Sequence, residues 1–381
     1  MSIILFLIIL LVLIVAHEFG HFIAAKKAGV RVDEFAIGFP PKIFSWVRGE
    51  TKYSINLLPF GGFVKIFGED PDDESLTGAD RARSLTSQPR WIQAWVVLAG
   101  VLFNFVLAWI LFSFGFLIGM PTPVDGAPKG AKFENVALTI TQVLKDSPAD
   151  KVGLKVGDKI VEIGTANETP NSTPLTPESE RSSYLTPEPV RKFIETHGDQ
   201  KLAIIYKEAG TSDGVVKAAL LMPISGIVKD KPAIGVSFEM IGVAKLPIYL
   251  AVWEGGKQTI FVTELTVKGL YGLVKKAVVG EADIKSLTGP VGIVGLVGTA
   301  SSFGFSYLIS FVALISVNLA VLNFLPFPAL DGGRAFFILI ESVIRRPIPP
   351  KFLNIVNALG FIFLIGLMLV VTYHDILRLI Y

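Results

Sequence analysis

The amino-acid sequence contains the pattern His17-Glu-Phe-Gly-His21, whose residue types and spacing suit metal chemistry. Residues i and i+4 lie on one face of a helix, so both imidazoles can bind a single Zn²⁺ ion. Glu18 would then lie beside a water held near the metal, take a proton from it and pass that proton to a leaving amine. This is the chemistry of a metalloprotease, with His17 and His21 as metal ligands and Glu18 as the catalytic acid and base.

A catalytic zinc ion usually has three protein ligands and one position open to water. The chain has no cysteine, so the third ligand must be His, Asp or Glu. His197 and His374 are poor candidates because one lies in a polar region and the other at the far end of an apolar stretch. Asp331 follows an apolar run and is the better candidate, although Asp-Gly-Gly also suits a helix-terminal turn. Other divalent metals could bind the same set.

Composition indicates a membrane protein. Of the 381 residues, 51% are hydrophobic and 28 are Phe. A soluble globular protein of this size is rarely so apolar, so several membrane spans with one soluble domain are expected. The formal net charge is +2 with no basic face, which argues against nucleic acid as a partner. The absence of cysteine excludes disulfides and thiol catalysis.

Long apolar stretches predict about four transmembrane α-helices, since about 20 residues cross the hydrocarbon core. We place these helices at residues 1–25, 91–119, 305–333 and 355–373. The first stretch lacks a basic start and a cleavage site, so we expect it to remain as a span. It contains His17, Glu18 and His21, and ionisable residues inside a span are costly and usually functional.

Basic residues indicate the orientation. They follow the first span, precede the second and separate the last two: Lys26, Lys27, Arg31, Arg81, Arg83, Arg90, Arg345, Arg346 and Lys351. Because positive loops stay in the cytosol, these clusters predict a multi-pass protein of the cell (inner) membrane. The active site would face the cytosolic side, and the segment from Met120 to about Ala300 would be extracytoplasmic.

Residues 26–90 are too apolar for a plain loop and too charged for a span. Within them, Tyr53–Lys65 is typical of a membrane-associated β-hairpin, with two short alternating strands around Pro59, Gly61 and Gly62.

Residues 130–230 have the composition of a small α+β domain. The segment from Ser147 to Ile163 predicts a short helix, a turn at Gly157-Asp158 and a strand, and it resembles the PDZ fold. A Ser/Thr/Pro-rich insert lies between Thr165 and Pro189. Residues 231–304 form an amphipathic linker region, in which the charged apolar stretch 246–279 is more typical of an interfacial helix than of a span.

The HExxH pattern in a first span, one PDZ-like segment and Asn323-x-x-Pro-x-Pro-x-Leu-Asp-Gly332 in a later span together resemble the site-2 protease family (M50), specifically RseP-type bacterial intramembrane zinc metalloproteases. Four further segments match: Gly29–Phe39, Gly100-x-x-x-Asn104, Gly289-Pro-Val-Gly-Ile293 and Ile315-Ser-Val-Asn-Leu319. The likeness covers nearly the whole chain, although RseP itself has tandem PDZ domains and this chain has one.

The resemblance implies that Asp331 completes the zinc site and that Glu18 is the catalytic acid and base. The hairpin with Gly61 and Gly62 would enter the membrane and pair with an extended substrate segment by β-strand addition. By the same likeness, Asn323, Pro326 and Pro328 would hold the peptide open, although Asn323 also suits a packing role.

The resemblance further implies substrates that are single-span membrane proteins in the lipid bilayer, such as anti-sigma factors or signal peptide remnants. Two other functions are considered. A non-enzymatic scaffold whose PDZ-like domain binds partner tails would have no need for Glu18 between metal-spaced histidines. A zinc transporter would carry more polar residues along its spans.

Overall fold

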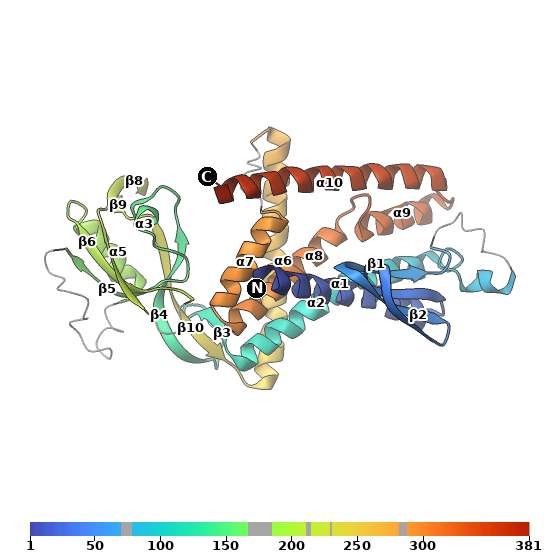
Figure 1. Cartoon of the computed structure of the whole chain (residues 1–381), viewed down its shortest axis with the longest axis horizontal. Helices are drawn as coiled ribbons and strands as arrows, with labels where there is room; N and C mark the ends of the chain where they lie inside the picture. The colour runs from blue at the N-terminus through green and yellow to red at the C-terminus, as the bar shows by residue number, and fades with distance from the viewer. Residues whose placement is uncertain (70–77, 167–184, 211–214, 229–230, 282–287, 381) are drawn as a thin grey trace. The chain divides into compact units, whose positions relative to one another are not determined.

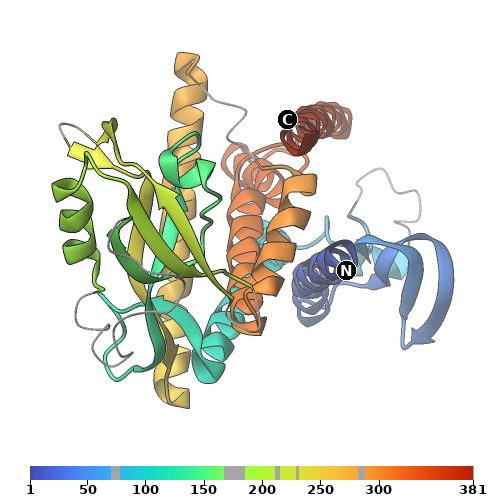
Figure 2. The same ribbon diagram turned by 60° about the vertical axis from the view of Figure 1, so that its left-hand side comes forward.

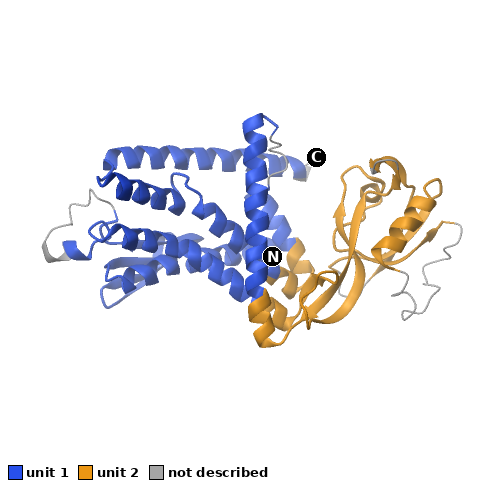
Figure 3. Ribbon diagram, turned by 180° about the vertical axis from the view of Figure 1, so that it is seen from behind, with its two compact units in different colours: residues 1–113, 255–298, 310–381 blue, residues 114–254, 299–309 orange. Residues whose placement is uncertain are grey.

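The computed structural model describes residues 1–381 except 70–77, 167–184, 211–214, 229–230, 282–287 and 381, so most of the predicted Ser/Thr/Pro-rich insert lies outside the described residues. The chain divides into two compact units (Figure 3). Unit 1 comprises residues 1–113, 255–298 and 310–381, and unit 2 comprises residues 114–254 and 299–309.

Four helices among the described residues are long and apolar enough to cross a bilayer (Figure 1). They are α1 (Ser2–Lys27), α2 (Arg90–Ile118), α8 (Phe305–Phe324) and α10 (Pro350–Ile380). Each overlaps one predicted stretch, but the third prediction, 305–333, is too long. The helix α8 ends at Phe324 because Pro326 and Pro328 cannot continue it, and a separate helix, α9 (Asp331–Ile344), begins at Asp331.

Small residues bring α1 and α2 together in unit 1. A Cβ atom added to Gly20 would lie 2.3 Å from the carbonyl oxygen of Ala99, so the two backbones touch at this point. Around the contact lie the buried residues Ala24, Ala25, Val96 and Ala99. Helices in lipid associate through such close packing, because burial of apolar surface gives no advantage there.

Unit 1 contains a β-hairpin, but its turn is not where the sequence predicted it. The strands are β1 (Val32–Arg48) and β2 (Thr51–Ile66), and the turn between them is at Gly49. Gly49 has φ +65°, a conformation that glycine adopts without strain. The whole predicted hairpin, Tyr53–Lys65, lies within β2. Its two halves pair with β1 rather than with each other, since Phe35 lies opposite both Tyr53 and Val64.

Ion pairs fix the hairpin turn to neighbouring elements. The Glu50 carboxylate accepts from Lys26 at the end of α1 and from Arg83 in η1 (Gly78–Arg83), each at 2.7 Å. These two cations hold the pKa of Glu50 below its ordinary value. The turn, the end of α1 and the segment leading to α2 therefore meet at one carboxylate.

Unit 2 contains a six-stranded sheet in which all neighbouring strands are antiparallel, in the order β3-β10-β4-β5-β6-β7. The strands are β3 (Met120–Pro123), β4 (Lys132–Val143), β5 (Lys159–Thr165), β6 (Leu202–Lys207), β7 (Val216–Leu221) and β10 (Val236–Lys245). Figure 2 shows helix α5 (Pro187–Thr196) beside this sheet. Val190 and Ile194 of α5 pack into a core with Leu138 and Ile204.

The predicted domain limits, 130–230, are too narrow for this sheet. Both β3 and β10 lie outside them, and β10 pairs with β3 on one side and β4 on the other. Two smaller elements also belong to the unit: helix α3 (Pro148–Lys151) and a hairpin of β8 (Ile224–Val228) and β9 (Lys231–Ala233).

Two further helices lie in the range predicted as an amphipathic linker, α6 (Ile248–Val279) and α7 (Pro290–Ser302). Although α6 has 32 residues, it is not among the helices apolar enough to span a membrane. It packs against spanning helices in unit 1: Gly255 touches Ser113 of α2, and Thr266 donates to Asn318 of α8 at 2.7 Å.

The Gly20 contact predicts a stability effect. In a Gly20→Ala variant the added methyl would overlap the Ala99 carbonyl, so α1 must move away from α2. We expect a loss of about 1–3 kcal/mol in unfolding free energy, as for other overpacked sites, and a lower midpoint of thermal unfolding in detergent. In the control, Gly366→Ala in α10, the new methyl has nothing within 4 Å. Equal midpoints for the two variants would contradict close packing at Gly20.

Candidate metal centre

Two imidazoles from α1 and one carboxylate from α9 converge in unit 1. The Oδ2 atom of Asp331 lies 3.0 Å from Nε2 of His17 and 3.3 Å from Nε2 of His21. The two Nε2 atoms are 3.2 Å apart. Within the part of the chain that the structure describes, these residues form the one cluster of three His, Asp or Glu side chains placed to share a metal ion.

The geometry fits zinc. Zinc bonds to nitrogen and oxygen of about 2.0–2.2 Å at tetrahedral angles separate the ligand atoms by roughly 3.3–3.5 Å, close to the observed distances. The Nδ1 atom of His21 lies 2.9 Å from the Val96 carbonyl oxygen, which can only accept, so Nδ1 carries the proton and Nε2 a free lone pair. Oδ2 of Asp331 is buried and has no hydrogen-bond donor. Lone pairs facing one another in this way call for a cation.

A glycine in α2 leaves room for the two rings. A Cβ atom on Gly100 would lie 2.3 Å from Nε2 of His21 and 2.9 Å from Cε1 of His17. Any larger residue would therefore occupy the space in which the imidazoles meet. Sequence reasoning noted Gly100 only as part of a matching motif, and its steric role becomes visible once α1 and α2 are packed.

The Asp-Gly-Gly segment positions Asp331 at the first residue of α9. Cβ atoms on Gly332 and Gly333 would lie 2.3 Å and 2.1 Å from carbonyl oxygens of the preceding loop, at Leu325 and Phe327. The first turn of α9 thus packs directly on that loop. Nearby, the Ala329 amide donates to Asn357 of α10 at 3.2 Å. Both glycines are needed to hold the carboxylate against α1.

Two ion pairs hold the rest of α9. Arg334, one turn after Asp331, donates to the side chain and the backbone carbonyl of Glu69, just beyond β2. Glu341, nearly buried, pairs with Arg90 at the start of α2 at 2.8 Å and accepts from the Ile348 amide at 2.9 Å. The helix that carries Asp331 is therefore fixed at both ends.

Glu18 shares a cavity of about 180 Å³ with the three metal-binding candidates. The cavity is lined by His17, Glu18, His21, Phe63, Val64, Ile66, Glu69, Leu85, Val96, Val97, Asp331 and Arg334. A Cβ on Gly62 would lie 3.7 Å from Cγ of Glu18, so β2 runs alongside the carboxylate. A carboxylate, three potential ligands and a strand thus meet in one small space.

The residues predicted to bind substrate fall into two groups, one on β2 and one near the end of α8. Gly62 lies beside Glu18, and Gly61 packs against the Phe39 ring. Asn323, Pro326 and Pro328 are near the end of α8 and do not line the cavity. Pro328 instead touches Gly360 of α10.

The polar residue Asn104 contacts the site, and the sequence did not predict a role for it. It is fully buried in α2, and its side-chain amide nitrogen lies 3.2 Å from Nδ1 of His17. Its spacing of four residues from Gly100 puts both on one face of α2, a signal that was present in the sequence.

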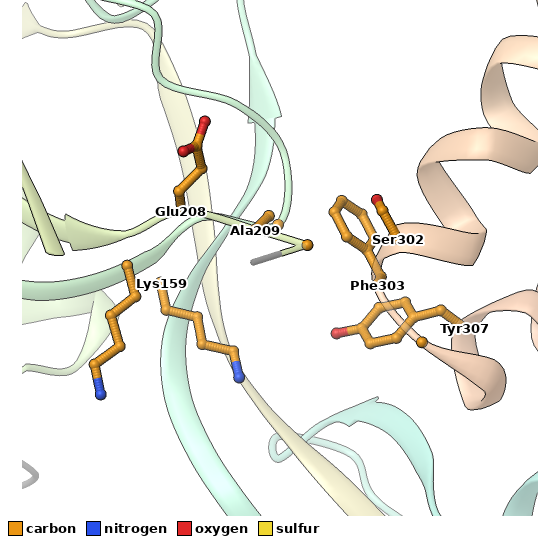
Figure 4. A pocket seen from close by; sticks show the side chains of 10 residues that line it. Lys159, Glu208, Ala209, Ser302, Phe303 and Tyr307 are labelled. Atoms are coloured by element: carbon orange, nitrogen blue, oxygen red, sulfur yellow. The ribbon is translucent and has the colours of Figure 1, made fainter. Parts of the chain in front are cut away.

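A larger cavity, of about 370 Å³, lies within unit 2 (Figure 4). Its walls include Lys159, Glu208, Phe303 and Tyr307. The Glu208 carboxylate is bound by Lys217 at 2.5 Å, which lowers its pKa. The described residues that line this cavity include no second carboxylate and no imidazole, so the cavity does not offer a metal site.

Comparison with protein families gives one match over nearly the whole chain. The model described as "Peptidase family M50" matches residues 5–367. This range includes all three potential ligands and Glu18.

Individual relatives are consistent with this family match. The chain is 37% identical to a protein of Clostridium perfringens over 371 residues, which cover 96% of this chain and 95% of the relative. It is 34% identical over 366 residues to one of Clostridium acetobutylicum, with 96% and 94% covered. It is 29% identical over 448 residues to one of Vibrio cholerae, with 98% of each covered. All three relatives carry the name "Putative zinc metalloprotease".

The site predicts that zinc affinity depends on Asp331. In an Asp331→Ala variant the two imidazoles keep their places, but one ligand atom is lost. We expect zinc affinity, measured by chelator competition on the purified protein, to fall more than the roughly 100-fold that removal of a ligand's hydrogen-bond partner can cost. A Glu264→Ala control, which removes an exposed carboxylate paired with Lys268 on α6, should bind zinc normally. Unchanged affinity in the Asp331 variant would exclude this carboxylate as a ligand.

Proposed function

The chain belongs to peptidase family M50, the site-2 protease family, and is a zinc metalloprotease, and we propose that it hydrolyses peptide bonds within or near the transmembrane segments of single-span membrane proteins. One observation carries this proposal. The imidazoles that meet Asp331 and share a cavity with Glu18 belong to a helix apolar enough to cross a bilayer. The family and the names of the relatives disfavour a non-enzymatic scaffold.

In the proposed mechanism, His17, His21 and Asp331 would hold zinc, which when bound would supply Lewis acidity for the scissile carbonyl. Glu18 removes a proton from the attacking water and delivers it to the leaving amine, so that each proton taken up is returned to product. Phe63, Val64 and Val97 line the same cavity and limit the access of other water molecules.

A transmembrane helix hides its peptide bonds, so a substrate must be extended before cleavage. We propose that it pairs with the Gly62–Ile66 part of β2, by strand addition. In support, Phe63 and Val64 line the cavity beside Glu18, and β1 is the one strand partner of β2 among the described residues. Asn323, Pro326 and Pro328, just before Asp331, would keep the peptide from refolding into a helix.

We propose that the site faces the cytosolic side of the cell membrane. Three basic residues in or beside the segment between α1 and α2 meet acidic partners within unit 1: Lys26 and Arg83 bind Glu50, and Arg90 binds Glu341. The ends of α1, α2 and α9 that carry these charges therefore lie on one side, as the positive-inside rule requires.

The sheet of unit 2 would then form an extracytoplasmic PDZ-like domain. Its strands, α3 and α5 support this proposal, as does a cavity of about 490 Å³ whose walls include Ile194 of α5 and Val236 of β10.

The mechanism predicts the effect of Glu18→Gln. Glutamine cannot take up a proton, but the metal ligands remain, so we expect zinc content to be unchanged. Cleavage of a model single-span substrate in proteoliposomes should fall at least about 100-fold, the lower end for general acid–base catalysis. A Glu264→Gln control should cleave like the wild type. Cleavage by Glu18→Gln at the wild-type rate would contradict the assigned role.

Strand addition predicts a preference among substrates. Two model substrates of equal hydrophobicity would differ only at the cleavage region, one with Gly and Pro there and the other with Leu. Because Gly and Pro disfavour the helix, we expect the first to have a several-fold higher kcat/KM. Faster cleavage of the Leu-rich substrate would argue against an extended bound peptide.

A further inference from the structure

The position of Asn104 in α2 is fixed by the protein around it. Its side chain is fully buried, and its backbone carbonyl accepts a hydrogen bond from the hydroxyl of Ser316 of α8 at 2.8 Å. Ser316 is fully buried as well. The side-chain amide therefore meets His17 from a site that two helices hold in place.

The two histidines of α1 need the same tautomer. Nε2 of each faces Asp331, so Nδ1 of each must carry the proton if both are to bind zinc. For His21 the acceptor of that proton is the Val96 carbonyl. For His17 the group at hydrogen-bond distance from Nδ1 is the Asn104 amide, which presents its nitrogen at 3.2 Å.

An amide nitrogen donates and cannot accept, so this orientation sets two N–H groups against each other in the zinc-binding tautomer. The amide oxygen of Asn104, meanwhile, is buried without a partner. A rotation of the amide by 180° exchanges oxygen and nitrogen in nearly the same volume. Either orientation leaves one end without a partner, but only the rotated one gives His17 an acceptor.

We propose that Asn104 is a positioning residue, which accepts a hydrogen bond from Nδ1–H of His17 and thereby fixes the tautomer in which Nε2 binds zinc. This inference rests on the proposed zinc site. Gly100 and Asn104 lie one turn apart on the same face of α2. Gly100 leaves room for the two imidazole rings, and Asn104 orients the ring of His17. Such partners of metal-bound histidines fix ring orientation and raise ligand basicity.

The first test compares zinc affinity in variants of the full-length protein, by chelator competition. Asn104→Leu keeps the branching at Cγ and the number of side-chain heavy atoms but removes the acceptor, so we expect about 10–100-fold weaker zinc binding. Asn104→Asp has an oxygen in either orientation and should bind within a few-fold of the wild type. The control Glu264→Ala, which removes an exposed carboxylate paired with Lys268 on α6, leaves Asn104 and its neighbours in place and should bind zinc normally.

The outcomes separate this inference from the zinc site itself. If Asn104→Leu binds zinc as tightly as the wild type while His17→Ala does not, only the role of Asn104 is overturned. If neither variant loses affinity, the zinc site fails as well. Equal losses in the Leu and Asp variants would mean that packing, rather than the acceptor, matters, and would also overturn the inference.

A second measurement needs no variant of Asn104. The chain has four histidines, so nitrogen-15 labelling of histidine gives a simple NMR spectrum. In the zinc-loaded wild type, we expect His17, assigned by its loss in His17→Ala, to show a protonated Nδ1 and a metal-bound Nε2. A protonated Nε2 on His17 would overturn the inference even if the Leu variant does not fold.

Discussion

The structure depends on bringing three metal-binding atoms together: two imidazole nitrogens of the apolar helix α1 and one carboxylate oxygen of α9. Charged and polar groups are costly within a bilayer unless they are paired or bind an ion, so the contact of His17, His21 and Asp331 is stable only around a cation or shared protons. Backbone contacts at Gly20, Gly100, Gly332 and Gly333 make the convergence possible, because a side chain at any of them would overlap a carbonyl or an imidazole. These contacts fix α1 against α2, and α9 against the loop before it.

Charged groups outside the spans support the same arrangement. Glu50 joins the end of α1 to the segment before α2, and Glu341 joins α9 to the start of α2. Single surface ion pairs contribute little to stability. Glu341, however, is nearly buried and has two partners, so its loss would remove the ion pair with Arg90 and the acceptor of the Ile348 amide. The apolar part of unit 1 thus sets how closely the helices approach, and the polar part sets which helix ends meet.

The sequence predicted the chemistry better than the fold. The i, i+4 spacing placed His17 and His21 on one face of a helix, because helix geometry is local. The lack of cysteine and the apolar run before Asp331 made this residue the better third candidate, and the family resemblance implied it as the ligand. The hairpin turn was wrongly placed at Pro59–Gly62, because Tyr53–Lys65 bends around β1 and its halves pair with that strand on either side, a long-range feature. The predicted limits of the domain in unit 2 were too narrow because β10 follows a hairpin and returns to pair between β3 and β4. The contact of Asn104 with His17 needs the packing of α1 on α2, which periodicity does not specify.

The central claim is that two imidazoles and one carboxylate bind a single zinc ion. X-ray absorption at the zinc edge tests it most directly, on the full-length protein in a lipid bilayer. The account predicts a first shell of four nitrogen or oxygen atoms at about 2.0–2.1 Å, with outer-shell scattering from two imidazole rings and no more. Scattering from one ring, from three rings, or from six oxygen atoms at longer distance would contradict it.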